Sequence, residues 1–327
     1  MKRLLITGGT GFIGSHIVEY LLDKTDWEII VMYNTNRKHI IESLPNYDSN
    51  RVIFFNNNLR EPLYRYEYEL MGDVDYVLHL AAKTNVNESI EKPEYYIENN
   101  IMCTVRLFEF LKKYMNPKKI INYGTDEVYG PAPEDYNFTE EDRWRPSSPY
   151  SASKCGQMAV GMAYARTYGM PIIHSYTMNV FGERQSNDKL IPLCIKSILD
   201  DKPMTIHSKI VDGKVKEIGS RHWLYAKSAA SATLFLLENA KINEHYNIRG
   251  DIELNNKSVC DTIGFFMGKD PKYEYVDFHK TRPGHDRRYS LDGTKIKEMG
   301  WESPYDFDTS LEQTVNWYID NKEFLYD

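Results

Sequence analysis

The sequence has few cysteines, no long apolar run and no excess of positive charge. Its 4 cysteines, Cys103, Cys155, Cys194 and Cys260, form no C-x-x-C pair, which argues against a disulfide framework or a zinc site and favours a cytoplasmic protein. No segment reaches the roughly 18 to 20 apolar residues of a membrane span, and the first residues do not resemble a signal peptide. A net charge of -7 gives no basic surface for nucleic acid. We therefore expect neither a membrane nor a nucleic-acid partner.

Apolar strand-like runs alternate with helical patterns along the first half of the 327-residue chain. The predicted strands are Leu4 to Thr7, Glu28 to Met32, Val52 to Phe55, Tyr76 to Leu80, Lys119 to Tyr123, Ile172 to Tyr176 and, later, Tyr246 to Ile248. This alternation is typical of an α/β fold with a doubly wound parallel sheet of the Rossmann type. We expect a dinucleotide-binding domain over residues 1–178, to which a segment near 222–250 returns. Residues 179–327 should form a smaller, mixed α/β substrate lobe.

A glycine-rich turn directly follows the first predicted strand and opens the first helix. The cofactor-binding residues predicted in this turn are Gly8, Gly11, Phe12, Ile13 and Gly14. The first glycine permits a tight turn, the second lets a pyrophosphate approach the backbone, and the third allows helix and strand to pack closely. The helix N-terminus adds unpaired N–H donors. We therefore predict a bound dinucleotide rather than a plain turn.

The second predicted strand ends without the acidic residue that usually binds the ribose of NAD. Asn34 is a polar side chain at this point, and Arg37 and Lys38 follow it. Two interpretations remain: a pocket that accepts the 2′-phosphate of NADP, or a solvated loop in which Asn34 bonds the ribose of NAD. Asn58 and Leu59 follow the third predicted strand, where we expect them to contact the adenine.

The segment Ser147 to Lys154 predicts the start of a helix, with a serine cap and a proline in the first turn. Tyr150 and Lys154 are four residues apart and should share one face of this helix. A tyrosine pKa is ordinarily about 10, but a nearby ammonium group and an oxidised nicotinamide ring both favour the phenolate. Such a tyrosine can take a proton from a sugar hydroxyl while hydride leaves to the cofactor. The alternative is an exposed helix with an unrelated Tyr and Lys.

Together, the predicted sheet, the glycine turn and the Y-x-x-x-K pair resemble the extended short-chain dehydrogenases/reductases. The resemblance implies a catalytic partner in Thr125, which follows the fifth predicted strand, and a structural asparagine in Asn100. The cofactor contacts that it implies, besides those of the glycine turn, are Leu80, Ala81, Ala82, Tyr150 and Lys154.

Two carboxylates, Asp126 and Glu127, stand immediately after Thr125 in the sequence T-D-E-V-Y-G. In isolation they are compatible with two solvated loop acids, but the whole phrase resembles the nucleotide-sugar 4,6-dehydratases of this family. Oxidation of a sugar at C4 acidifies C5–H, so that elimination needs a base at C5 and an acid at O6. By resemblance Glu127 is the base and Asp126 the acid, and their proximity should push their pKa values apart. Hydride then returns to C6, which leaves a 4-keto-6-deoxy sugar.

Several downstream segments resemble the part of the dehydratases that covers the sugar and the diphosphate. Arg221 matches an arginine that faces the diphosphate, and a guanidinium can form two parallel hydrogen bonds with phosphate. The phrase from Arg282 to Tyr289 is typical of dehydratases that act on dTDP- or UDP-glucose. The substrate-binding residues that the resemblance implies are Thr84, Asn179, Lys189, Leu190, Arg221, Asn247, Arg282 and His285. Three positions depart from the pattern: Cys103 and Arg249 replace a usual glycine, and His222 replaces a usual aspartate.

These observations predict an NAD-dependent 4,6-dehydratase that acts on a nucleotide hexose, dTDP-glucose or UDP-glucose. NAD is favoured over NADP because the cofactor is regenerated in each turnover. The alternatives are a 4-epimerase or a 5,6-dehydratase of the same family, or a non-catalytic nucleotide-binding scaffold. The histidines lack metal-binding spacing, so we expect no catalytic metal. We also expect a homodimer formed by the helical segments Ile97 to Leu111 and Lys154 to Tyr168, as is usual in this family.

Overall fold

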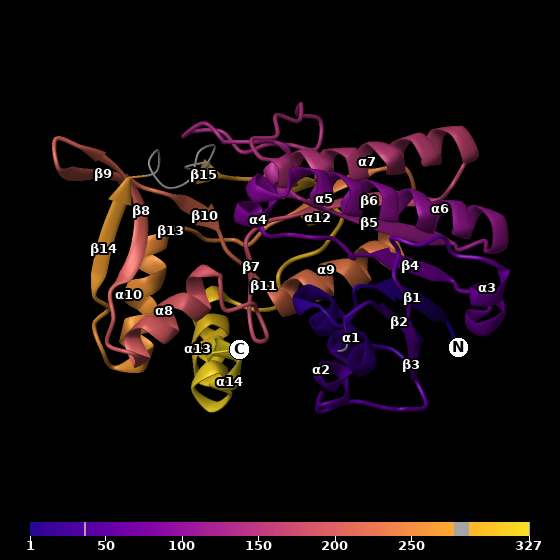
Figure 1. Cartoon of the computed structure of the whole chain (residues 1–327), viewed down its shortest axis with the longest axis horizontal. Coiled ribbons are helices and arrows are strands. Elements are labelled where there is room, and N and C mark those ends of the chain that lie inside the picture. The colour runs from indigo at the N-terminus through magenta and orange to yellow at the C-terminus, as the bar shows by residue number, and fades with distance from the viewer. Residues whose placement is uncertain (36, 278–287, 327) are drawn as a thin grey trace.

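The computed structural model describes residues 1–35, 37–277 and 288–326, which form an α/β protein (Figure 1). Its main sheet has 7 strands in the order β12-β6-β5-β4-β1-β2-β3, and neighbouring strands are parallel. These strands are β1 (Arg3–Thr7), β2 (Glu28–Tyr33), β3 (Val52–Asn56), β4 (Tyr76–His79), β5 (Lys119–Thr125), β6 (Ile172–Thr177) and β12 (His245–Ile248). The fold class expected from the sequence is confirmed, and every predicted strand is present within one or two residues at each end.

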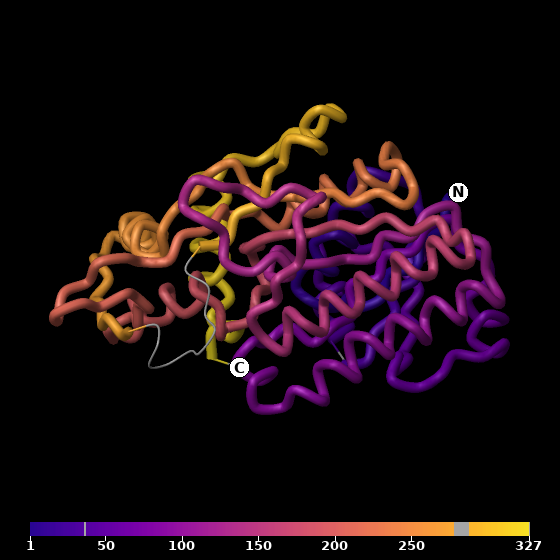
Figure 2. Tube along the Cα trace, turned by 90° about the horizontal axis from the view of Figure 1, so that it is seen from above, coloured from indigo at the N-terminus to yellow at the C-terminus, as the bar shows by residue number. Residues whose placement is uncertain are grey.

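Successive residues of each strand enter two separate apolar layers. In β1, Leu4 and Ile6 pack in the layer that contains α1 (Phe12–Lys24) and α9 (Ala226–Asn239). Leu5 lies in the opposite layer, with α6 (Cys103–Tyr114) and α7 (Pro149–Tyr168), which run side by side (Figures 1 and 2). Because helices cover both faces, the central strands are apolar on both sides, and each fully buried Leu or Ile contributes about 1.5 to 3 kcal/mol.

Five shorter helices of the described residues lie in the segments that connect or follow the strands of the main sheet. They are α2 (Lys38–Glu42), α3 (Arg65–Met71), α4 (Val86–Glu91), α5 (Pro93–Ile97) and α12 (Thr294–Glu298). A π-helical turn, Glu98–Met102, joins α5 to α6 and contains Asn100, which is fully buried. The Asn100 amide bonds both backbone groups of Lys83 and donates to the hydroxyl of Ser153. It therefore ties the loop after β4 to α7.

The second lobe lies at the other end of the molecule (Figure 1). Its helices are α8 (Leu190–Leu199), α10 (Asn256–Met267), α13 (Phe307–Asp320) and α14 (Glu323–Tyr326). Its small sheets have the orders β14-β8-β9, β13-β10-β15 and β11-β7. Their strands are β7 (Val180–Phe181), β8 (Met204–Val211), β9 (Lys214–Ile218), β10 (Ser220–His222), β11 (Leu224–Tyr225), β13 (Glu253–Asn255), β14 (Tyr273–Asp277) and β15 (Arg288–Tyr289). This lobe has its own apolar core, to which α8, α10 and α13 contribute Ile195, Ile263 and Val315.

The chain crosses between the two parts more than once. After β11, helix α9 packs on α1, and β12 then pairs with β6 at the edge of the main sheet. Tyr246 and Ile248 of β12 share an apolar layer with Leu4 of the first strand. None of the helices in the described ranges combines the length and apolar character that a membrane crossing requires.

Candidate active site

A cavity of about 1060 Å³ lies at the carboxyl ends of the main strands, and the second lobe forms its other wall. Strand β1 lies between β2 and β4, so the chain order of the sheet reverses beside it. Open α/β sheets bind their ligands at this kind of reversal. The cavity is lined by the glycine turn, by residues after β2, β4 and β5, and by parts of α7, α8, β8 and β10.

The glycine turn has the form of a phosphate cradle. Gly8 has a φ of 72°, in the left-handed region that favours glycine. A Cβ atom on Gly14 would lie 2.4 Å from the carbonyl oxygen of Gly8, so only glycine lets α1 begin this close to β1. Gly11 is the N-cap of α1 and has no side chain to occupy the first backbone N–H groups of the helix. The residues present therefore fit a dinucleotide pyrophosphate.

The end of β2 borders the cavity with neutral side chains. Asn34 and Asn58 both line it, and the amide of Asn34 donates to the side-chain oxygen of Asn58 at 3.4 Å. Arg37 and Lys38 are not among the lining residues, and the Lys38 ammonium lies 5.5 Å from the centre of the Tyr33 ring. This placement favours the interpretation in which Asn34, rather than a cationic pair, meets the ribose.

The start of α7 brings Tyr150 and Lys154 to the cavity. Ser148 and Ser151 cap the helix reciprocally and Pro149 is its first residue, as the sequence predicts. Lys154 lies one turn beyond Tyr150, and its amine donates to the carbonyl of Tyr123 at 2.7 Å. Burial lowers the pKa of Lys154 to about 7.

The expected lowering of the Tyr150 pKa by Lys154 is not found. Burial raises the pKa of Tyr150 and the charge of Glu127 raises it further, whereas a hydrogen bond with Thr125 lowers it. Burial opposes the charged form of each group, because it raises the pKa of the tyrosine and lowers that of the lysine. The sequence shows the spacing of the pair but not the burial that governs both groups.

The two carboxylates lie on a 3₁₀ turn, Asp126–Val128, directly after β5. Thr125 caps this turn: its hydroxyl accepts from the backbone N–H of Glu127 and lies 3.1 Å from the Oδ1 atom of Asp126, to which it donates. Asp126 is 5% exposed, and its Oδ2 atom is buried without a hydrogen-bond partner within residues 1–35, 37–277 and 288–326. Burial raises the pKa of Asp126 to about 7, against the opposing effects of Thr125 and Arg221. Burial, rather than the expected proximity to Glu127, causes this shift.

Arg221 reaches the cavity from the second lobe. It lies on β10, is 8% exposed, and its guanidinium carbon lies 5.3 Å from the centre of the Tyr289 ring. The Nη1 atom of Arg221 is buried and has no hydrogen-bond partner among the residues that the structure describes. The Nδ2 atom of Asn179, another lining residue, is likewise buried without a partner in the described part of the chain. These donors are suited to an anionic, oxygen-rich ligand.

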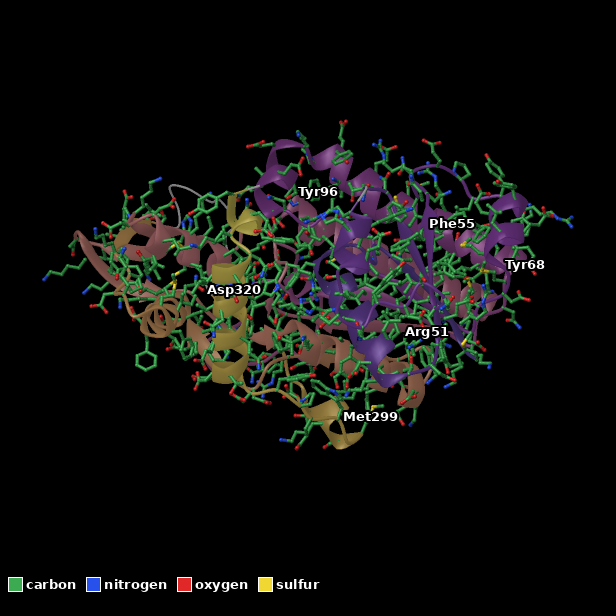
Figure 3. The ribbon with its side chains drawn as sticks, turned by 90° about the horizontal axis from the view of Figure 1, so that it is seen from below. Arg51, Phe55, Tyr68, Tyr96, Met299 and Asp320 are labelled. Carbon is green, nitrogen blue, oxygen red and sulfur yellow. The ribbon has the colours of Figure 1, made fainter. Side chains whose placement is uncertain are left out.

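The rim of the cavity is held by contacts between distant segments. Tyr96 of α5, labelled in Figure 3, is fully buried; its hydroxyl accepts from the backbone N–H of Asn85 and donates to Glu88. The side-chain amide of Asn85 in turn donates to Asp188 at 3.1 Å. The loop after β4 is thereby linked to the segment that precedes α8.

Most of the predicted site residues meet at this cavity. Those that line it are Gly8, Gly11, Phe12, Ile13, Gly14, Asn34, Asn58, Leu59, Leu80, Ala81, Ala82, Thr84, Thr125, Asp126, Glu127, Tyr150, Lys154, Asn179, Lys189, Leu190 and Arg221. Asn247 does not: it is fully buried in β12, donates to the carbonyl of Phe138 and accepts from Tyr129. Arg282 and His285 lie outside the described residues.

Several lining residues of the second lobe were missed by the sequence analysis. They include Met204, Thr205 and His207 of β8, Asn256 at the start of α10, and Tyr289 of β15. Tyr289 ends the phrase Arg282 to Tyr289 that carries the resemblance, but no glycine or charge motif marks the other positions. The alternation of inward and outward side chains along β8 is the only signal that could have selected Thr205 and His207 together.

A phosphate cradle, a buried tyrosine and lysine on one helix, and two carboxylates at a shared cavity define a dinucleotide-dependent enzyme that moves protons as well as hydride. Comparison with known proteins makes the class more specific. A family model described as GDP-mannose 4,6 dehydratase matches residues 5–314. The chain belongs to this family, within the extended short-chain dehydrogenases/reductases, which confirms the resemblance found in the sequence.

Individual relatives match over nearly the whole chain. A dTDP-glucose 4,6-dehydratase of Escherichia coli is 36% identical over 347 residues, which cover 99% of this chain and 94% of that protein. The crystal structure of DesIV, a dTDP-glucose 4,6-dehydratase from Streptomyces venezuelae with NAD and TYD bound, superposes with a TM-score of 0.87 at 32% identity and covers 98% of both chains. A UDP-glucose 4-epimerase of Thermus thermophilus with NAD reaches a TM-score of 0.85 at 27% identity, over 97% of this chain and 99% of that chain.

Proposed function

We propose that this protein is an NAD-dependent lyase that converts a nucleoside-diphosphate hexose, dTDP-glucose or UDP-glucose, to the 4-keto-6-deoxy sugar nucleotide. The observation that carries this proposal is the pair Asp126 and Glu127 beside Thr125 and Tyr150 in one cavity. The named 4,6-dehydratases among its relatives, and the NAD in the related dehydratase structures, support the same reaction and cofactor.

The first step is oxidation at C4, and Tyr150 is its base. The phenolate form of Tyr150 takes the proton of the sugar 4-hydroxyl and becomes the phenol, and Thr125 hydrogen-bonds the Tyr150 side chain. Bound NAD would supply the hydride acceptor at C4, a positive ring charge near the phenol and the hydride returned to C6. Gly8, Gly11 and Gly14 hold its pyrophosphate, and Leu80, Ala81 and Ala82 border it.

The second step is elimination of water between C5 and C6. Glu127 removes the C5 proton, which the neighbouring C4 ketone acidifies, and Asp126 gives a proton to the departing C6 hydroxyl. An acid must hold its proton at working pH, and the raised pKa of Asp126, about 7, meets this requirement. The Thr125 hydroxyl orders both groups because it contacts the Asp126 side chain and the Glu127 backbone.

The second lobe binds the nucleoside diphosphate in this proposal. Arg221, with its unpartnered buried Nη1 atom, and Asn179 face the phosphates, while Lys189 and Leu190 cover the substrate at the start of α8. We propose the corresponding division of the chain: residues 1–178, with the returning segment near 222–250, bind the cofactor, and residues 179–327 supply most of the substrate contacts.

We further propose that two copies of the chain pair through the helical segments Ile97 to Leu111 and Lys154 to Tyr168. Exposed apolar side chains occur on this helical layer, with Ile97 and Met102 each 38% exposed and Met162 43% exposed. Light scattering after size-exclusion chromatography tests the pairing, and a mass of one chain would contradict it. The 4 free cysteines support a reducing compartment, and we place the enzyme in the cytoplasm.

A panel of nucleotide sugars analysed by mass spectrometry tests the reaction. Incubation with NAD and either dTDP-glucose or UDP-glucose should give a product that is lighter by one water. A product of unchanged mass with inverted C4 would contradict the proposal and support a 4-epimerase, the activity named for several structurally similar proteins. Failure of every sugar to react would support a non-catalytic scaffold.

A further inference from the structure

Strand β10 presents different chemistry on its two faces. Arg221 points to the cavity, and successive side chains of a strand face opposite sides, so Ser220 and His222 lie behind it. The hydroxyl of Ser220 donates to Glu253, which also receives two hydrogen bonds from Arg288. The arginine that faces the substrate is therefore supported from behind by a polar network.

His222 is the least expected member of this network. It is 5% exposed, and its Nε2 atom lies 2.9 Å from the Nη1 atom of Arg249. A guanidinium can only donate, so Nε2 accepts and the proton of the neutral imidazole resides on Nδ1. The Nδ1–H group donates to the hydroxyl of Ser290 at 3.2 Å, and that hydroxyl donates to the side-chain oxygen of Asn137. Each group in this series thus donates a hydrogen bond to the next, from Arg249 through His222 and Ser290 to Asn137.

The surrounding charges keep His222 neutral. Burial, together with the charges of Arg249 and Arg288, lowers the pKa of His222 to about 4, and Glu253, whose Oε2 atom lies 4.0 Å from Nδ1, opposes this shift. An aspartate at this position would instead stand near the Glu253 carboxylate. The neutral histidine avoids that repulsion, provided that a donor fills its Nε2 site.

The backbone and the side chain of Arg249 are closely packed on the way to His222. A Cβ atom on Gly250 would lie 1.7 Å from the carbonyl oxygen of Trp223, so the backbone after Arg249 runs directly against the residue that follows β10. A Cβ atom on Gly293 would lie 3.2 Å from the Cγ atom of Arg249, so the arginine stem passes closely over that glycine. Arg249 and His222 come from separate segments of the chain, and in this structure they contact each other.

We propose that Arg249 is a positioning residue that acts through His222 to hold Arg221 in the orientation that binds the substrate diphosphate. The inference rests on the proposed function, because it assigns the diphosphate to Arg221. Arg249 and His222 then form one unit, because the arginine supplies the donor that the Nε2 atom of the histidine requires. Removing Arg249 leaves a buried imidazole nitrogen without a partner and loosens β10 directly behind Arg221.

Binding of dTDP and UDP to the NAD-loaded protein, measured by titration calorimetry, tests this unit. Arg249→Gln should raise the Kd of the nucleoside diphosphate about tenfold, which corresponds to about 1.4 kcal/mol. KM for the nucleotide sugar should rise in parallel, with kcat within about twofold, because a positioning defect in diphosphate binding acts on substrate affinity. Arg249→Lys should recover most of the affinity, since an ammonium can also donate to Nε2. Arg65→Gln, at an exposed arginine of α3, is the matched control and should change nothing.

A double substitution tests the pairing itself. Arg249→Gly combined with His222→Phe should lose less affinity than the sum of the two single losses, because a phenyl ring at position 222 needs no arginine donor. Strictly additive effects would contradict the inference, as would an Arg249→Gln variant with wild-type affinity. Equal losses of NAD affinity and thermal stability in Arg249→Gln and Arg249→Lys would show a merely structural role. A wild-type protein that binds neither dTDP nor UDP would instead contradict the proposed function.

Discussion

Replacing Asp126 by Asn should stabilise the protein more at high pH than at low pH. Asp126 is buried with one unpartnered oxygen, and burial raises its pKa from 3.8 to about 7. A carboxyl group whose pKa is higher in the folded state binds more protons when folded. The free energy of unfolding therefore falls as pH rises from the unfolded pKa to the folded pKa, and this loss is complete above about pH 7.

The size of the effect follows from the shift. One pKa unit corresponds to about 1.4 kcal/mol, so a shift of about three units costs the folded protein about 4 kcal/mol once the group is ionised. About 1.7 kcal/mol of this cost is already present near pH 5, because the unfolded chain is then mostly ionised. Between about pH 5 and pH 8 the wild-type protein should thus lose about 2.5 kcal/mol through this residue alone, and Asp126→Asn should not.

Urea unfolding of both proteins at about pH 5 and pH 8, at constant ionic strength, measures this difference. The gain of the variant over the wild type should be larger at the higher pH by about 2.5 kcal/mol. Asp135→Asn, at an exposed carboxylate, is the control and should show no such dependence. An advantage of Asp126→Asn that is equal at both pH values would refute the argument that ionisation of this buried carboxyl group destabilises the fold.

Other substitutions separate the remaining roles. Glu127→Gln should form the reduced nicotinamide on addition of the sugar nucleotide, seen by its absorbance, but release no dehydrated product; normal release would show that Glu127 is not the base. Tyr150→Phe should show neither signal, and full formation of the reduced nicotinamide would contradict its role at C4. Burial lowers the pKa of Lys154 to about 7, so between about pH 7 and pH 10 the unfolded chain binds a proton that the folded protein does not. The free energy of unfolding of the wild type should therefore rise over this range, and that of Lys154→Met should not. Urea unfolding at both pH values measures the difference. Gly14→Ala should abolish NAD binding in a fluorescence titration, because the new Cβ would lie 2.4 Å from the Gly8 carbonyl oxygen; wild-type binding would contradict the cradle.

The main sheet was predictable because its strands are buried on both faces and therefore appear in the sequence as continuous apolar runs. The second lobe was expected as a smaller mixed α/β region, but its individual strands were not predictable, since strands such as β10 and β15 have only three and two residues. Strands this short carry no periodicity. Their pairing depends on contacts between segments far apart in the chain, and Arg221 of β10 accordingly lies beside Tyr289 of β15.

In the candidate site, too, the local motifs were predictable and the features that depend on the folded chain were not. The glycine turn, the Tyr150–Lys154 pair and the carboxylates are local motifs, so their sequence spacing indicated their geometry. Asn247 was expected at the substrate, but the sequence does not show which way a strand residue points, and its amide is fully buried against the Phe138 carbonyl. Burial also determined the pKa values of Asp126 and Lys154, and burial is a property of the folded chain.

The position of β12 has a consequence for how the protein is made. A ribosome releases β6 long before His245–Ile248, the strand that covers its outer edge. During that interval the nascent sheet exposes an open edge of unpaired backbone groups, and an apolar layer still lacks α9. The cofactor-binding half therefore cannot complete its folding during its own synthesis. We expect a chain that ends near residue 178 to aggregate or to require a chaperone, whereas the full-length chain completes the sheet by its own later segment.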